Sequence, residues 1–498
     1  MALAKTLSAA LSGAQANVVR VEANIGPGLP GTFIVGLGDA AVGEARDRLK
    51  TAAANAKLCW PKTKVMVNLS PASMPKHGTM MDLAICMAIL GAGAERFDIE
   101  HVLFLGEVGL DGRIAGVRGV AAGILAAADA KVHIAVVPQA NAEEAACVAP
   151  EHLTVLVGDN IAQVAKWCQG EVTLEQARST QHVPTRHLNM LDVVGQQQAK
   201  RAAMIAAAGG HHFMMIGPPG SGKSMIAKRF AGLLPPLPPE QERECRAICS
   251  ITGEEFSGPP FVAPHHSVSK ASLLGGGSGL PKPGAVTKAH RGVLFLDEVS
   301  EIAAGVLDAL RVPLDRGKVE LLRANGSMSF PAQFQLVLAA NPCRCGAAEA
   351  RDCECKPQQR ARYLQNLSGP LRDRLDMVVR TEPKGSLREL NGMSSEEMAQ
   401  GAARARMRAQ QRFASMGMHA TNNARVPAGR LRKDLQAAPD AMALLESYLA
   451  VGALSQRAVD RTLRLAWTIA DLAASTTPNI DHVAEALEYN ATMQELIA

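Results

Sequence analysis

The sequence predicts a multidomain α/β protein that ends in an α-helical domain. The chain has 498 residues, which corresponds to about three average domains. Up to about residue 170, short apolar runs alternate with alanine-rich stretches, a pattern typical of mixed α/β structure. An apolar run, a glycine-rich loop and a helical pattern follow one another from residue 213, and from about residue 386 apolar residues recur every three or four positions.

Composition limits the kinds of partner that the protein can have. Lys and Arg number 52 against 47 Asp and Glu, so the net charge of +5 allows a polyanionic partner without the dense basic excess of a DNA-coating protein. No apolar run approaches the length of a membrane span, and the first residues hold no apolar segment of the signal-peptide type. We therefore expect a soluble, cytoplasmic protein without a membrane partner. With 11 Phe, 3 Tyr and 3 Trp, the chain offers few rings for stacking on bases, so nucleic acid would be bound mainly through its phosphates.

The order of these patterns divides the chain into three domains and a linker. Residues 1–172 carry the first mixed α/β pattern, in which 120–130 is one of the alanine-rich stretches. Residues 173–190 are polar and lack an apolar period, as expected of a linker. A nucleotide-binding α/β domain is predicted at 191–385 and a helical domain at 386–498.

A phosphate-binding loop is predicted between the strand 213–217 and the helix 224–234. The loop fits G-x-x-x-x-G-K-[ST], in the strand-to-helix context that this motif requires. Its backbone N–H groups surround the phosphates, Lys223 reaches the β and γ oxygens, and the Ser224 hydroxyl binds Mg²⁺. The alternative, a chance glycine-rich turn, does not account for the flanking strand and helix. The predicted ATP-binding residues are Gly217, Pro218, Pro219, Gly220, Ser221, Gly222, Lys223 and Ser224.

Two adjacent carboxylates end the apolar run that begins at Val293. Asp297 suits the Mg²⁺ shell, and Glu298 suits the positioning and polarisation of the attacking water. A solvated acidic turn after a buried strand is the alternative for this pair alone. The preceding phosphate-binding loop favours the catalytic interpretation.

Four cysteines form a compact group in the sequence. Two C-x-C pairs, separated by seven residues, place four thiols within 13 residues. Four thiolates suit a closed, tetrahedral structural zinc site, although the spacing differs from the usual two to four residues, and reduced thiols in a loop remain the alternative. An iron–sulfur cluster is a weaker alternative because its usual spacings differ. The four residues are Cys343, Cys345, Cys353 and Cys355.

These motifs, with others along nearly the whole chain, resemble the ComM/YifB family of magnesium-chelatase-like AAA+ ATPases. The further motifs are FVAPHHSVSK at 261–270, AHRGVLFLDE at 289–298, LDALRVPL at 307–314, FQLVLAANP at 334–342 and SGPLRDRLD at 368–376. The resemblance implies a Lon-protease-like α+β amino-terminal domain, an AAA+ P-loop core with insertions and a carboxyl-terminal helical lid. Cysteine pairs recur at the same place in this family, which favours structural Zn²⁺.

The resemblance also implies roles for polar residues outside the phosphate-binding loop. Asn341 takes the sensor 1 place, and Arg374 matches an arginine finger that acts on a neighbouring subunit, which implies a closed, hexameric ring. Arg457 takes the sensor 2 place, but Arg461 and Arg464 share its helix, and spacing does not decide which of the three meets phosphate. The adenine side is expected at Val194, Gly195 and Gln196.

A peptidase is the alternative that a Lon-like domain raises, and the residues argue against it. Lon-type hydrolysis needs a serine nucleophile and a lysine base, and those places hold Met80 and Ala121. Ser70 and Ser73 are nearby hydroxyls without a lysine partner at a suitable spacing. We expect this domain to serve as a scaffold or to contact DNA.

The resemblance implies an ATP-driven motor that migrates and unwinds branched DNA in homologous recombination and natural transformation, with a recombinase as a possible partner. A magnesium-chelatase motor subunit and a protein remodeller are the alternatives. The Lon-like domain and the cysteines are not features of the plain chelatase motor, which favours DNA, single- and double-stranded as well as branched. The insertion 258–285 and a predicted hairpin at 319–330, with a tight turn at Asn325 and Gly326, carry basic side chains that would line a pore, although each also fits a solvated face. These side chains are Lys270, Lys282, Lys288, Arg316, Lys318 and Arg323, of which we choose Lys288 and Arg323 as DNA contacts.

Overall fold

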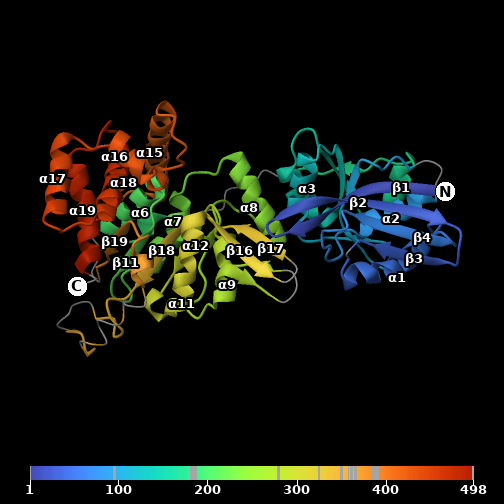
Figure 1. The fold of residues 1–498 in the computed structure, drawn as a ribbon, viewed down its shortest axis with the longest axis horizontal. Coiled ribbons are helices and arrows are strands. Elements are labelled where there is room, and N and C mark those ends of the chain that lie inside the picture. The colour runs from blue at the N-terminus through green and yellow to red at the C-terminus, as the bar shows by residue number, and fades with distance from the viewer. Residues whose placement is uncertain are drawn as a thin grey trace.

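Two β-sheets and a helical bundle follow one another along the molecule, as the computed structural model in Figure 1 shows. The structure describes residues 2–36, 38–93, 97–179, 188–277, 281–323, 326–347, 352–356, 358, 363, 367–382 and 392–495. The amino-terminal sheet lies at one end, the carboxyl-terminal helices at the other, and a parallel sheet between them. Within the described ranges, no helix combines the length and apolarity that crossing a membrane requires.

The amino-terminal sheet is mixed, with the strand order β10-β9-β8-β5-β1-β2-β4-β3. Its strands are β1 (Ala2–Ser12), β2 (Gln15–Gly26), β3 (Gly31–Val35), β4 (Lys64–Ser70), β5 (Val102–Phe104), β8 (Ile134–Pro138), β9 (Thr154–Gly158) and β10 (Glu175–Gln176), and β6 (Glu107–Val108) and β7 (Ile114–Ala115) form a small separate hairpin. The helices are α1 (Ala40–Asn55), α2 (Asp82–Ala92), α3 (Val120–Asp129), α4 (Ala142–Val148) and α5 (Ile161–Cys168). Helices α2 and α3 cover opposite faces of this sheet. Thr6 of β1 donates a hydrogen bond to Ala84 O of α2, whereas Ala9 of β1 lies beside α3. Because successive residues of a strand point to opposite faces, these two residues, three positions apart, lie on different sides. Strand β10 extends this sheet into the segment that the sequence assigned to a linker.

The central sheet has five parallel strands in the order β12-β15-β18-β11-β19. The strands are β11 (Phe213–Ile216), β12 (Phe261–Val262), β15 (Val293–Leu296), β18 (Gln335–Ala340) and β19 (Met377–Arg380). Most of their residues are fully buried, because helices cover both faces of the sheet, and this agrees with the continuous apolar runs in the sequence. All five carboxyl ends meet at one edge, which is where ligands bind to sheets of this kind.

Short helices and two hairpins surround the central sheet. The helices are α6 (Gln197–Gly209), α7 (Lys223–Phe230), α8 (Pro239–Thr252), α9 (Lys270–Leu274), α10 (Ala285–Lys288), α11 (Ala304–Leu307), α12 (Arg311–Arg316) and α14 (Gly369–Arg372). The hairpins pair β13 (Gly275–Gly276) with β14 (Lys282–Pro283), and β16 (Lys318–Arg323) with β17 (Gly326–Pro331). The second hairpin is the predicted one, while Asn325 of its turn lies outside the described residues.

The carboxyl-terminal domain is helical, as the sequence predicts. It consists of α15 (Ser395–Ser415), α16 (Ala428–Asp434), α17 (Pro439–Ala450), α18 (Gln456–Leu472) and α19 (Ile480–Glu495). Ser394 and Glu397 form a capping box that starts α15. The buried face of this bundle shares one apolar core with α6, α7 and β11, so the helical domain is packed onto the nucleotide-binding domain.

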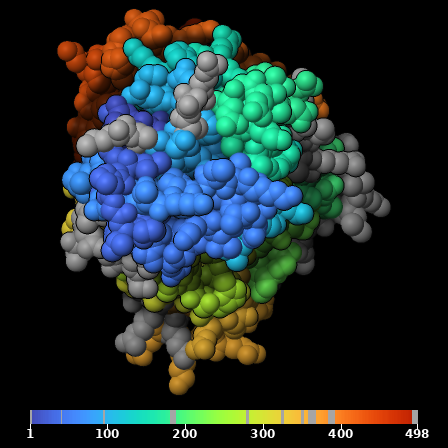
Figure 2. Space-filling view, turned by 90° about the vertical axis from the view of Figure 1, so that its right-hand side faces the viewer, coloured from blue at the N-terminus to red at the C-terminus, as the bar shows by residue number. Residues whose placement is uncertain are grey.

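The amino-terminal domain contacts the central domain through α8 and the β16–β17 hairpin, which lie beside it in Figure 1. Ala14, in the turn between β1 and β2, packs against Ile248 of α8 and Phe330 of β17. Ser250 O accepts a 3.0 Å hydrogen bond from Gly119 N, where α3 begins. Seen from its own end of the molecule in Figure 2, the amino-terminal domain lies in front of the other two.

Candidate active site

The phosphate-binding loop begins where β11 ends, at the carboxyl edge of the central sheet. Lys223 starts α7, and its Nζ donates hydrogen bonds to Gly217 O at 2.6 Å and Pro218 O at 2.9 Å. The same Nζ lies 3.1 Å from Asn341 Oδ1, because Asn341 follows the neighbouring strand β18. Burial lowers the pKa of Lys223. The structure therefore brings together two residues that the sequence assigned to the phosphates.

The predicted magnesium ligands also meet. Ser224 Oγ donates a 2.7 Å hydrogen bond to Asp297 Oδ2, and this bond joins the start of α7 to the residue after β15. A hydroxyl and a carboxylate are ligands that Mg²⁺ accepts, usually together with phosphate oxygens and water. The residues present therefore fit a magnesium ion held beside the triphosphate of a bound nucleotide.

Glu298 is held differently from its neighbour. Its backbone has φ +49°, in the left-handed region that few non-glycine residues adopt, and its N–H donates to Asp297 Oδ1 at 2.9 Å. Its Oε2 lies 3.0 Å from Nδ1 of His266, a residue of the loop that follows β12. His266 is part of the FVAPHHSVSK motif, yet the sequence suggested no role for it, because only the parallel register of β12 and β15 brings the two residues together.

A threonine at the same edge completes the loop's support. Thr381 follows β19, and its Oγ1 lies 2.7 Å from Ser221 Oγ. A Cβ at position 217 would approach this Oγ1 to 2.0 Å, which explains why the loop begins with a glycine. Thr381 is buried and was missed in the sequence, where it carries no motif signal.

The expected adenine-side segment lies near the phosphate-binding loop. A Cβ at Gly222 would contact Val193, the residue before Val194, at 3.8 Å. Gln196 is fixed by a reciprocal pair of hydrogen bonds with the backbone of Glu382, at 2.7 and 3.1 Å. Gly195 has a left-handed backbone, which allows the chain to turn into α6.

Arg374 lies at the opposite edge of the sheet from the phosphate-binding loop. It precedes β19, whose first residue pairs with Phe213 at the start of β11, whereas the loop follows the end of β11. A four-residue strand spans about 13 Å at about 3.3 Å per residue, so Arg374 does not share the edge at which its own subunit binds phosphate. Arg374 pairs with both carboxylate oxygens of Asp315, at 2.8 and 2.5 Å, which raises its pKa.

The three candidate sensor 2 arginines differ in their surroundings. Arg457 has an 85% exposed side chain and lies 3.2 Å from Asp373, next to the predicted arginine finger. Arg461 is bonded to Asn490 Oδ1 and Leu375 O, and Arg464 is bonded to Val426 O. Arg457 is therefore the one of the three with a solvent-exposed side chain, on the arginine-finger side of the domain.

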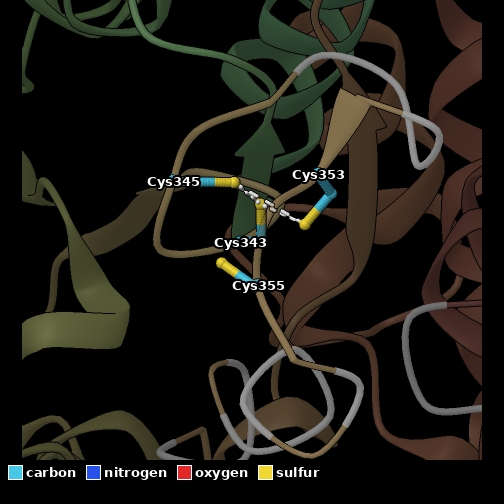
Figure 3. A group of neighbouring side chains, drawn as sticks. All are labelled: Cys343, Cys345, Cys353 and Cys355. Atoms are coloured by element: carbon cyan, nitrogen blue, oxygen red, sulfur yellow. Dashed lines mark hydrogen bonds between the residues drawn. The ribbon is translucent and has the colours of Figure 1, made fainter.

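The four clustered cysteines converge, as Figure 3 shows. Sγ of Cys343 lies 3.2 Å from Sγ of Cys345 and 3.4 Å from that of Cys353, and all four Sγ atoms lie within 4.8 Å of one another. In a tetrahedral site with zinc–sulfur bonds of about 2.3 Å, the sulfur atoms are about 3.8 Å apart. A hydrogen bond from the Ala347 amide lowers the pKa of Cys345 to about 6, which favours the thiolate that a metal binds, whereas burial and the neighbouring thiols raise the pKa of Cys343. The donor set and its spacing fit a structural zinc ion.

This cysteine loop contacts the phosphate-binding loop. Gly346, with φ +74°, approaches Pro219 so closely that a Cβ would lie 2.8 Å from its ring. Cys343 is also two residues from Asn341. The cysteine cluster is thus adjacent to two parts of the nucleotide site.

Of the two residues chosen as DNA contacts, the structure describes the side chain of Lys288 but not that of Arg323. Other basic residues of the insertion and the hairpin are described with them. Lys288 lies 2.5 Å from Glu254, and Lys318 lies 2.6 Å from Glu320, so both carry acidic partners. The backbone of Arg323 ends β16, but its side chain lies outside what the structure describes. Lys270, Lys282 and Arg316 are also exposed.

The two Lon-dyad positions lie in one apolar cluster. Met80 and Ala121 are both buried there, with Leu103 and Leu105. The Ala121 amide donates a 3.2 Å hydrogen bond to Ser250 Oγ of α8, so the central domain covers this place.

Three protein-family models match the chain in succession. Residues 21–141 match subunit ChlI of Mg-chelatase, residues 189–388 match magnesium chelatase subunit ChlI, and residues 392–490 match the carboxyl-terminal part of that subunit. These matches define a magnesium-chelatase-like protein of the AAA+ class.

Relatives of similar length narrow the family. The chain is 37% identical to the competence protein ComM of Haemophilus influenzae, over 100% of this chain and 99% of that protein. It is 36% identical to the YifB protein of Escherichia coli, with the same coverage, and 44% identical to an uncharacterized protein of Mycobacterium tuberculosis over 99% of both chains. The chain belongs to the ComM/YifB family of magnesium-chelatase-like proteins.

Proposed function

We propose that this protein is an ATP-driven ring motor that moves branch points in DNA. The observation that carries the proposal is that Lys223, Asn341, Ser224 and Asp297 meet in a chain that is similar over its whole length to a competence protein. The site argues for ATP hydrolysis, and the relative argues for DNA as the substrate of the motor.

The hydrolytic part of the proposal rests on the carboxyl edge of the central sheet. Lys223 and the loop amides would bind the β and γ phosphates, and Ser224 and Asp297 would hold Mg²⁺, which would supply neutralisation of the phosphate charge. Asn341 orients the γ-phosphate or the attacking water, and Glu298 accepts the proton of that water.

The placement of Arg374 supports the proposed ring. An arginine at the opposite edge of the sheet supports a role at the nucleotide of a neighbouring subunit, where it stabilises the charge of the transition state. Arg457, beside Asp373, would act from the same side. Subunits that complete one another's sites form a closed ring, which we propose to be a hexamer.

DNA binding is proposed at the insertion and the β16–β17 hairpin. In the sequence this hairpin lies between α12 and β18, the strand that Asn341 follows, so a short stretch of chain would connect it to the nucleotide site. Lys288 and Arg323 would contact phosphates. For Lys288, this requires that DNA replace Glu254 as its partner.

The amino-terminal domain is proposed to be Lon-like in fold without hydrolytic activity. Buried Met80 and Ala121 supply neither a nucleophile nor a base. Its contacts with α8 and the hairpin support a scaffold role close to the proposed DNA path, where a partner recombinase would also bind.

A chelatase motor subunit is the second candidate. Three chelatase family models favour it, and the magnesium-chelatase 67 kDa subunit of Chlorobaculum parvum is 30% identical. That similarity covers 30% of this chain, whereas the competence protein matches all of it, and so we favour DNA.

The test is to mix the purified chain with ATP and forked, three-stranded or four-stranded DNA and to measure hydrolysis and strand exchange together. The proposal predicts that branched DNA stimulates hydrolysis and that ATP moves the branch point. If a porphyrin-binding partner or a protein client stimulates ATP hydrolysis and no form of DNA does, the chelatase or remodeller function would replace the DNA-motor proposal.

A further inference from the structure

Two glycines allow the end of α6 to pack closely against the carboxyl-terminal helical domain. A Cβ at Gly209 would overlap Thr468 Oγ1 of α18, and a Cβ at Gly210 would overlap the side-chain amide of Asn422. Gly210 also has a left-handed backbone, which ends α6. The next residue, His211, is fully buried, and its Nε2 lies 2.7 Å from Thr468 Oγ1. This histidine therefore joins the central domain to α18 of the helical domain.

The other ring nitrogen of His211 faces the segment that carries the predicted arginine finger. His211 Nδ1 lies 3.4 Å from Oδ2 of Asp376, which is two residues after Arg374. The same carboxylate accepts a 3.0 Å hydrogen bond from the His212 amide, and the Asp376 amide donates a 2.9 Å hydrogen bond to His212 O. Although burial raises the pKa of the Asp376 carboxyl, its contacts with the two histidines lower this pKa to about 2, so Asp376 is an anion in these contacts.

Helix α18 holds the same segment at two further places. Arg461 donates a 3.1 Å hydrogen bond to Leu375 O, and Arg457 lies 3.2 Å from Asp373. With the contact through His211, this helix therefore holds residues on both sides of the arginine finger of its own subunit. The pair of Arg457 is solvent-exposed and stabilises little, whereas the contact through His211 is buried and only weakly screened.

We propose that His211 is a positioning residue that fixes the backbone of the arginine finger by tying Asp376 to α18. The proposal deepens the ATPase ring proposed above and rests on it. The Arg374 guanidinium is itself bonded to Asp315, so the contacts of α18 set where its backbone lies and leave the side chain free to change partner. Because the finger acts on the nucleotide of a neighbouring subunit, His211 acts on hydrolysis in that neighbour and not in its own subunit.

The test measures steady-state ATP hydrolysis by the full chain and its variants, alone and in mixed rings. His211→Ala should lower kcat about tenfold, the rate equivalent of one hydrogen bond to a charged group, and should leave KM within about twofold. Mixing it with Lys223→Ala should restore part of the activity, because an intact finger then faces an intact nucleotide site. Mixing it with Arg374→Ala should restore none, because neither variant supplies a well-placed finger.

His212→Ala is the matched control, because it removes the neighbouring buried imidazole, whose Nδ1 accepts a hydrogen bond from Leu336 N of β18. It should keep kcat within about twofold of the unmodified protein. Thr468→Val removes the hydroxyl that His211 contacts and should show the same pattern of rescue, and this variant decides the question if His211→Ala does not fold.

An unchanged kcat in His211→Ala, or an equal loss in His212→Ala, would overturn the inference. So would a loss in His211→Ala that Lys223→Ala does not rescue although it rescues Arg374→Ala. If Lys223→Ala rescues neither variant, the proposed ring with its finger in trans fails, and this result is distinguishable from the others.

Discussion

Ser224 Oγ and Asp297 Oδ2 are 2.7 Å apart, although the two residues belong to different motifs and different structural elements. This contact joins the start of α7 to the end of β15, so the phosphate-binding loop and the acidic strand end form one site. We expect variants of the phosphate-binding loop to lose nucleotide binding, and variants of the acidic strand end to lose hydrolysis while binding is retained.

Lys223→Ala should weaken ATP binding, and Glu298→Gln should retain bound ATP without turning it over. In the proposed mechanism Lys223 contacts the phosphates directly, while Glu298 acts on the water, a role whose loss costs about 10²- to 10⁴-fold in rate. A fluorescent ATP analogue measures binding, and phosphate release measures turnover. Undiminished hydrolysis by either variant would contradict the assigned site.

Arg374→Ala should bind ATP normally, but its rate of ATP hydrolysis should fall by about 10³-fold or more, as expected for a lost arginine finger. Mixing it with Lys223→Ala should restore part of the activity, because an intact Arg374 can then face an intact phosphate-binding loop. Asp315→Asn is the control, since it frees Arg374 from its internal partner and should leave hydrolysis intact. Mixed rings without any rescue would favour a role within one subunit.

Replacing Cys343 and Cys345 by Ser should release one zinc ion per chain. A lost metal cross-link should lower the midpoint of thermal unfolding by about 5 °C or more. Because Gly346 packs on Pro219, we also expect weaker ATP binding at higher temperature, as a consequence of the loosened loop. Elemental analysis of the unmodified protein is the direct check, and Cys59→Ser, at an exposed and distant cysteine, is the control. Absence of metal from the unmodified protein would remove the zinc site.

DNA binding should be nearly independent of sequence, tighter with ATP and log-linear in salt concentration. Few aromatic side chains leave phosphate contacts as the main source of affinity. Lys288→Ala and Arg323→Ala should each lower the salt slope by about one unit if the residue meets a phosphate. Fluorescence anisotropy across a salt series measures this. An unchanged slope would show that the side chain is only solvated.

Much of the site could be predicted from the sequence because its parts are local motifs. The residues that flank Lys223, Ser224 and Asp297 in the sequence are enough to predict their roles. The apolar runs at 213–216 and 293–296 predict the two buried strands that these residues follow. His266 and Thr381 could not be predicted in this way. Their roles depend on which strands are neighbours in the sheet, and a local pattern does not encode that order.

The same reasoning applies to the domain contacts. Nothing near Gly119 or Ser250 in the sequence indicates that α3 and α8 meet, and strand β10 is too short and polar to be recognised inside a predicted linker. The cysteine cluster was predictable from the sequence only in part. Its spacing suggested a metal, but only the fold shows that it lies against Pro219.

The most direct test of the central claim is coupling between ATP and a DNA branch point in one reaction. The purified chain is incubated with a labelled four-stranded junction, and ATP hydrolysis and junction resolution into two duplexes are followed together, with Glu298→Gln as the inactive control. We predict that the junction accelerates hydrolysis over linear duplex and that the junction is resolved only when ATP is hydrolysed. Hydrolysis that is the same with and without the junction, and a junction that stays intact, would contradict it.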